Sequence, residues 1–136
     1  MNMAERFTKQ HEEIVFLCQQ LKNSCAAEEI ERDASLIHGL QESFGVTLGQ
    51  HLLLEDSALY PSLLESRNLK IRQTAERLQK EVQVYADLHA VYQKKYASID
   101  DIRADITLYI DDTHKLLNLI LQRIHKEDIE LYPLLK

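Results

Sequence analysis

The sequence predicts an all-α protein, folded as an antiparallel up-down-up-down bundle of four helices. Only 3 glycines and 2 prolines occur in 136 residues, so few positions interrupt helical structure. Apolar residues recur at alternating steps of three and four, which is the spacing of a helix with one buried face. A chain of this length can bury a core without disulfides, and we expect one domain over residues 1–136.

The first two helices are predicted over residues 3–26 and 33–60. The buried face of the first comprises Phe7, His11, Ile14, Cys18, Leu21 and Cys25. The buried face of the second comprises Ile37, Leu40, Phe44, Leu48, His51, Glu55 and Leu59. Three glycines inside the second helix lower its propensity and suggest close helix contact. Pro61 is expected to end or kink this helix.

The third helix is predicted to follow Asn68, a suitable N-cap, and to continue to about residue 96. Its buried face comprises Ile71, Ala75, Leu78, Val82, Tyr85, His89, Tyr92 and Tyr96. Ser98 and Asp101 have the spacing of a capping box, with Asp in place of the usual Glu or Gln. The fourth helix then extends to about residue 131, and its buried face comprises Ile102, Ile106, Tyr109, Thr113, Leu116, Ile120, Arg123 and Glu127.

The charge and hydropathy of the chain restrict its partners. A net charge of −6 argues against binding to nucleic acid or to an anionic membrane surface. No apolar run is long enough to span a bilayer, and the N-terminus lacks the features of a secretory signal. Cys18 and Cys25 lie about 10 Å apart along one helix, too far for a disulfide, which suggests buried thiols in a reducing compartment. We therefore expect a cytoplasmic protein.

Polar residues interrupt the buried faces of all four predicted helices. They are His11, His51, Glu55, His89, Arg123 and Glu127. A buried carboxylate must be paired, protonated or bound to a metal, because an isolated charge in a core is very costly. Two glutamates and two or more histidines are the residue types of a di-iron carboxylate site. A buried ion-pair network, in which Arg123 pairs with both glutamates, accounts for the same residues. The residue types alone leave both interpretations open.

A repeated motif links two of these helices. Residues 51–61 and 123–133 both contain Glu-Asp followed by Leu-Tyr-Pro, so Glu55 aligns with Glu127. Four residues before each glutamate, the first copy has His51 and the second has Arg123. His51 and Glu55 lie on one face of a helix, one turn apart.

With this motif and the lone His11 of the first helix, nearly the whole chain resembles the hemerythrin-like family of HHE cation-binding domains. Members of that family are four-helix bundles that hold a non-haem di-iron centre. Two carboxylates bridge the irons, and histidines from all four helices complete the ligand set. Different members bind oxygen, sense oxygen or nitric oxide, or act in repair or storage.

The resemblance implies metal ligands at His11, His51, Glu55 and Glu127. It also implies that two family histidines are missing, because Arg123 and Val82 stand where histidines would be in the fourth and third helices. His89 lies at least about 10 Å along the third helix from the site, and we interpret it as a core residue. His125 and Glu130 have a spacing that also occurs in iron-binding bundles, but they are out of phase with the buried face of the fourth helix.

Both missing histidines belong to the same iron of the family's pair. We therefore predict a mononuclear site with iron, manganese or zinc, in which the Arg123 guanidinium replaces the second cation and bridges both carboxylates. The alternative is a metal-free regulatory or partner-binding module. A third interpretation is a di-iron protein that binds O2 or NO or repairs iron–sulfur clusters. The expected cofactor is therefore one or two iron ions, with manganese or zinc as alternatives. No motif for nucleophilic catalysis is present, which favours a binding protein over an enzyme.

Overall fold

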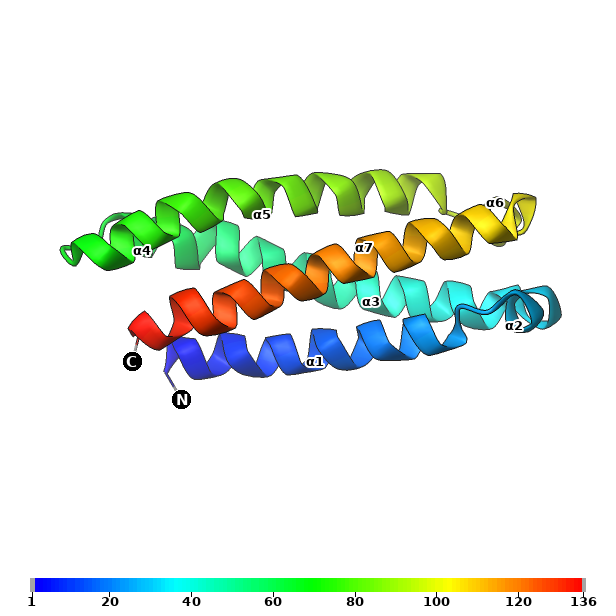
Figure 1. Ribbon diagram of the computed structural model, residues 1–136, viewed down its shortest axis with the longest axis horizontal. Helices are drawn as coiled ribbons and strands as arrows, with labels where there is room; N and C mark the ends of the chain where they lie inside the picture. The colour runs from blue at the N-terminus through cyan, green and yellow to red at the C-terminus, as the bar shows by residue number, and fades with distance from the viewer. Residues whose placement is uncertain (1, 136) are drawn as a thin grey trace.

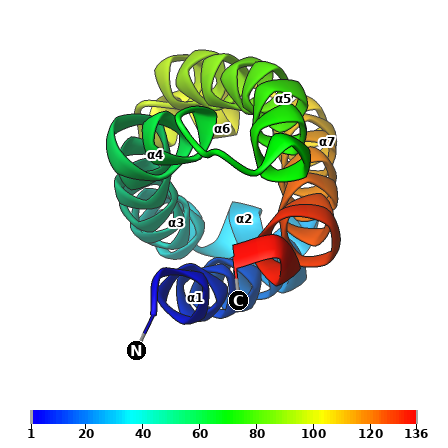
Figure 2. The same ribbon diagram turned by 90° about the vertical axis from the view of Figure 1, so that its left-hand side faces the viewer.

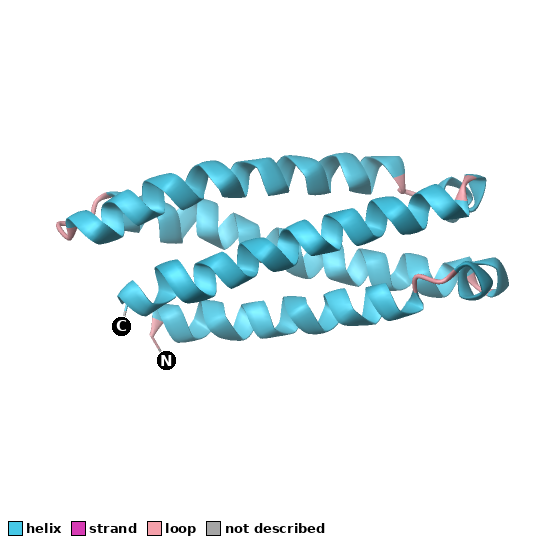
Figure 3. Cartoon of the chain, viewed as in Figure 1, coloured by secondary structure: helices cyan, strands magenta, loops and turns pink. Residues whose placement is uncertain are grey.

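Four long helices lie side by side and antiparallel in the computed structural model, which describes residues 2–135 (Figure 1). They are α1 (Met3–Ser24), α3 (Ala34–Leu54), α5 (Leu69–Lys95) and α7 (Ile106–Lys126). Seen end-on, the four helices surround a common core (Figure 2). Residues 2–135 contain no strand, and loops occur at the short connections and at the N-terminus (Figure 3). The predicted all-α bundle is confirmed.

Three short helices lie between the long ones. They are α2 (Ala27–Arg32), α4 (Tyr60–Leu64) and α6 (Ile99–Ala104). α2 and α4 fill connections where the sequence predicted turns, whereas α6 forms the start of the predicted fourth helix, which is therefore broken at Asp105. The second long helix begins at Ala34, next to the predicted start at residue 33. Asp33 and Asp105 act as the N-caps of α3 and α7, accepting hydrogen bonds from the backbone N–H groups of Leu36 and Leu108 at 3.3 and 3.0 Å, and the cap at Asp105 is the physical reason for the break.

The two predicted N-caps at the other helix starts are confirmed. The Asn68 side chain accepts hydrogen bonds from the backbone N–H groups of Lys70 and Ile71 at 3.0 and 3.2 Å. Ser98 and Asp101 form both bonds of a capping box, at 3.1 and 3.2 Å. Asp is therefore long enough at this position to reach back to the N-cap backbone.

Each copy of the repeated motif forms a π-helical turn. α3 continues into the turn Glu55–Leu59, and α7 continues into the turn Glu127–Leu131. In both, the backbone N–H of the motif tyrosine bonds to the carbonyl of the glutamate five residues earlier. Pro61 follows the first turn without ending the helix, which continues to Leu64. The predicted helix end at Pro61 is therefore wrong, because the proline occupies the first turn of α4, where its missing N–H is tolerated. Both turns place their tyrosine side chains in the core.

Two apolar clusters fill the bundle and enclose a polar layer between them. One cluster includes Ile14, Leu21, Phe44, Leu117 and Ile120, and the other includes Phe7, Leu59, Leu63, Leu78 and Leu131. Cys18 and Cys25 are free thiols buried in the first cluster, where burial raises their pKa values to about 12 and about 11. Among residues 2–135, no helix is long and apolar enough to cross a membrane.

The three glycines of α3 differ in their surroundings. A Cβ added at Gly39 or Gly49 would have no neighbour within 4 Å, whereas at Gly45 it would lie 2.7 Å from Gln93 Nε2. The expected close helix contact therefore exists only at Gly45. Gly39 and Gly49 only weaken the helix.

We predict that Gly49→Ala raises the free energy of unfolding by about 0.5–1 kcal/mol, because alanine has the higher helix propensity and meets open space. Urea denaturation of the parent and the variant measures the change. Gly45→Ala is the matched control and should gain less, because Gln93 must move aside. Equal gains at both positions would contradict the assigned surroundings.

Candidate metal centre

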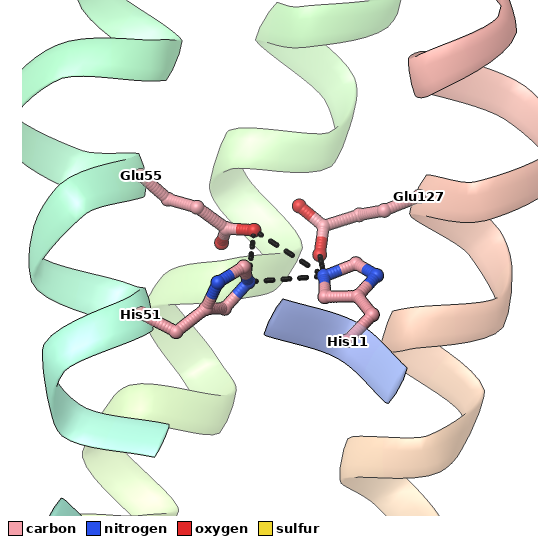
Figure 4. Close-up of side chains that lie close together, drawn as sticks. All are labelled: His11, His51, Glu55 and Glu127. Atoms are coloured by element: carbon pink, nitrogen blue, oxygen red, sulfur yellow. Dashed lines mark hydrogen bonds and ion pairs between the residues drawn. The ribbon is translucent and has the colours of Figure 1, made fainter. Parts of the chain in front are cut away.

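Four polar side chains from three helices converge inside the bundle (Figure 4). His11 comes from α1, His51 from the end of α3, and Glu55 and Glu127 from the first residues of the two π-helical turns. One ligand atom of each lies within 4.8 Å of all the others. The side chains are buried, with exposed fractions of 1%, 3%, 0% and 1%. The structure therefore brings together the four residues that the sequence selected.

The two histidines meet at their Nε2 atoms, 3.0 Å apart. The Nε2 atom of His51 is also 2.7 Å from Glu55 Oε1, and that of His11 is 3.3 Å from Glu127 Oε1. Two imidazole nitrogens and two carboxylate oxygens thus face one point, which is the donor set of many zinc, iron and manganese sites.

The outer nitrogen of each histidine is held by a hydrogen-bond acceptor. His11 Nδ1 donates to Asp128 Oδ1 at 2.8 Å, and His51 Nδ1 donates to Gln10 Oε1 at 2.7 Å. A proton on each Nδ1 leaves the Nε2 lone pairs facing the cluster, as in carboxylate–histidine–metal arrangements. Sequence reasoning missed both partners. Asp128 was visible as the Asp of the repeated Glu-Asp pair, whereas Gln10 carried no signal.

With both Nδ1 atoms protonated, the cluster requires a cation between the two Nε2 atoms. Two neutral rings would direct lone pairs at each other over 3.0 Å, so a proton or a metal ion must lie between them. Burial alone would lower the pKa of His11, but bonds to Asp128, Glu127 and Glu55 raise it to about 11. Without metal, His11 therefore carries a second proton, on Nε2, in addition to the one on Nδ1. The four donors fit a metal ion that takes the place of that proton.

The two glutamates ionise differently. Burial opposes ionisation of Glu55, yet hydrogen bonds from His11 and His51 hold its pKa well below the usual range. Burial and the neighbouring charge of Glu55 raise the pKa of Glu127. Glu55 is thus more readily ionised than Glu127 in the metal-free protein, and its carboxylate attracts a cation more strongly.

The tyrosines of the repeat join the two copies reciprocally. Tyr60 Oη donates to Glu127 Oε2 at 2.8 Å, and Tyr132 Oη donates to Glu55 Oε1 at 3.1 Å. Each tyrosine therefore contacts the glutamate of the other copy. Sequence reasoning did not assign them to the site, although both belong to the repeated Leu-Tyr-Pro segment.

Arg123 is buried beside the cluster, with 3% of its surface exposed. Its Nη2 contacts the hydroxyl of Tyr60 and lies 3.4 Å from Glu127 Oε2, and its Nη1 lies 3.7 Å from Glu81 Oε2. Among residues 2–135 it makes no ion pair with Glu55, so the expected bridge between both carboxylates does not form. The reason is that Glu55 turns toward His51, one turn earlier in its own helix.

The remaining sequence candidates lie outside the cluster. His89 is buried against Phe44, with ring centroids 5.8 Å apart, and burial lowers its pKa to about 4. His125 is exposed, and Glu130 pairs with Arg77 at 3.1 Å. His89 therefore acts as a neutral core residue, and the spacing of His125 and Glu130 does not form a site.

The fold and the cluster together define a four-helix bundle with a buried histidine–carboxylate site suited to cations. The family model described as the hemerythrin HHE cation binding domain matches residues 2–135. The chain therefore belongs to the hemerythrin family, as its motifs suggested. Comparisons with curated proteins and with solved structures give no match.

We predict that Asp128→Asn weakens metal binding by about 10–100-fold, because the amide no longer fixes the His11 ring and its tautomer. Competition with a coloured chelator measures the affinity. Asp56→Asn is the matched control, since Asp56 occupies the same place in the other copy of the repeat and lies in a surface hollow with Gln79 and Lys80. Equal losses in both variants would argue against this role.

We also predict that zinc binding releases about one proton at neutral pH, because His11 is protonated in the metal-free protein. A histidine with a raised pKa stabilises the metal-free fold below its ordinary pKa, and this stabilisation is lost as the pH rises through about 11. Metal affinity should accordingly increase with pH up to that value. Calorimetry with zinc in buffers of different ionisation enthalpy counts the protons, and a count of zero would refute the assignment.

Proposed function

We propose that this chain is a single hemerythrin-like domain over residues 1–136 that binds one metal ion for a sensing or metal-handling role. The ligands are His11, His51, Glu55 and Glu127. The observation that carries the proposal is the 3.0 Å contact between two histidine nitrogens whose outer nitrogens are already committed to other partners. Family membership favours iron, and manganese and zinc accept the same donors.

The two positions where family histidines are missing favour one bound metal ion over two. Arg123 stands where the resemblance expects a histidine, and its guanidinium contacts Glu127 through one nitrogen. Val82, at the other expected position, is a buried apolar residue packed in the cluster that contains Leu78. A fixed positive charge next to Glu127 also repels a second metal ion. Carriage of oxygen between two irons is therefore disfavoured, which leaves a sensing or metal-handling role at one metal.

A metal-free regulatory module is the alternative, and a charge count favours it. The buried carboxylates of Glu55 and Glu127 are balanced by the buried Arg123 guanidinium and by protonated His11, so these four groups together are neutral without metal. In that case the cluster would be part of the architecture and a protein partner would bind elsewhere. A di-iron O2/NO-binding or iron–sulfur repair protein ranks third, because it needs a second set of ligands.

We predict one iron per chain after reconstitution of the wild-type protein. Restoring both family histidines, with Val82→His and Arg123→His together, should raise the content to two. Arg123→Gln is the control, because it removes the charge without adding a ligand. Elemental analysis and the visible spectrum measure the metal.

Two irons in the wild-type chain would overturn the mononuclear site. No iron in any of the three proteins would favour the metal-free module.

A further inference from the structure

A fifth oxygen lies beside two of the four proposed ligands. Tyr132 Oη is 3.0 Å from His11 Nε2 and 3.1 Å from Glu55 Oε1. The side chain is buried, with 2% of its surface exposed, and its ring lies against that of His11 with centroids 4.9 Å apart. Metal–ligand bonds of 2.0–2.2 Å place neighbouring donors about 3 Å from each other. Tyr132 Oη therefore has the spacing of a donor that shares an ion with His11 and Glu55.

We propose that Tyr132 is a phenolate ligand of the metal and that the site is built for iron(III). This inference rests on the proposed function, because it requires a metal at the four-residue cluster. On binding, the phenol O–H bond breaks, an oxygen–iron bond forms and the proton leaves to solvent. No electron is transferred when the iron is supplied as iron(III).

Charge explains the choice of a trivalent ion. With Tyr132 ionised, the donors include three anionic oxygens, from Glu55, Glu127 and Tyr132, and two neutral imidazole nitrogens. Attraction to such a set increases with the charge of the ion, so iron(III) is held more tightly than iron(II), manganese(II) or zinc(II). A hard phenolate oxygen favours iron(III) for the same reason.

The other tyrosine of the repeat provides an internal contrast. Tyr60 Oη donates to Glu127 and contacts the Arg123 guanidinium, and it bonds to neither of the two site histidines. Tyr132 Oη contacts His11 Nε2, the ring nitrogen that faces the cluster. Tyr60 Oη instead contacts the Arg123 guanidinium, which we propose replaces a second metal ion. The two tyrosines are equivalent in the sequence repeat but differ in their access to the ion.

The test loads the full-length chain with iron(III) from ferric citrate and records iron content, visible absorption and resonance Raman spectra. We expect a visible phenolate-to-iron band whose excitation enhances tyrosine ring vibrations. Tyr132→Phe should lose the band, and Tyr60→Phe should keep it. The zinc-loaded protein serves as the colourless reference.

A wild-type chain that binds iron(III) without phenolate vibrations overturns this inference and leaves the proposed function standing. A chain that binds no metal overturns both. A band that persists in Tyr132→Phe, or that disappears only in Tyr60→Phe, also overturns the assignment. If Tyr132→Phe does not fold, the wild-type Raman spectrum and that of Tyr60→Phe decide together.

Discussion

The contact between the Nε2 atoms of His11 and His51 is the constraint on which the rest of the site depends. It exists because α1 and α3 pack with these two rings at the same level, 4.7 Å apart between centroids. Asp128 and Gln10 then fix which nitrogen of each ring carries a proton. Once both lone pairs face inward, a positive charge has to lie between them, and the glutamates are placed where they compensate it.

The surrounding apolar clusters offset the free-energy cost of burying these polar groups. Charged groups taken out of water lose hydration free energy that their mutual attraction only partly returns, so such a layer is a poor source of stability. The leucine, isoleucine and aromatic residues above and below it supply the favourable burial. The polar layer instead fixes the alignment of α1, α3 and α7, because any shift along a helix axis would separate the paired charges.

The sequence was sufficient for the bundle and for the four clustered residues. Their spacing follows the helical period, so a histidine or glutamate on a buried face stands out. The period did not predict the break at Asp105, since a cap interrupts a helix without disturbing the apolar pattern around it. The helical period also did not predict the partners of Arg123 or the contacts of each tyrosine with the glutamate of the other repeat copy. These contacts depend on side chains from different helices.

The π-helical turns also explain how the site tolerates a change in chain length. Each turn accommodates one residue more than an α-helical turn between a glutamate and the tyrosine that follows it. The wider turn takes up this residue without rotating the helix beyond it, so deleting one residue there would restore regular α-helix and leave the tyrosine on the same face as the glutamate. Within these two short segments, homologous sequences are therefore free to differ by one inserted or deleted residue. The site depends on the helix face that glutamate and tyrosine share and not on the number of residues between them.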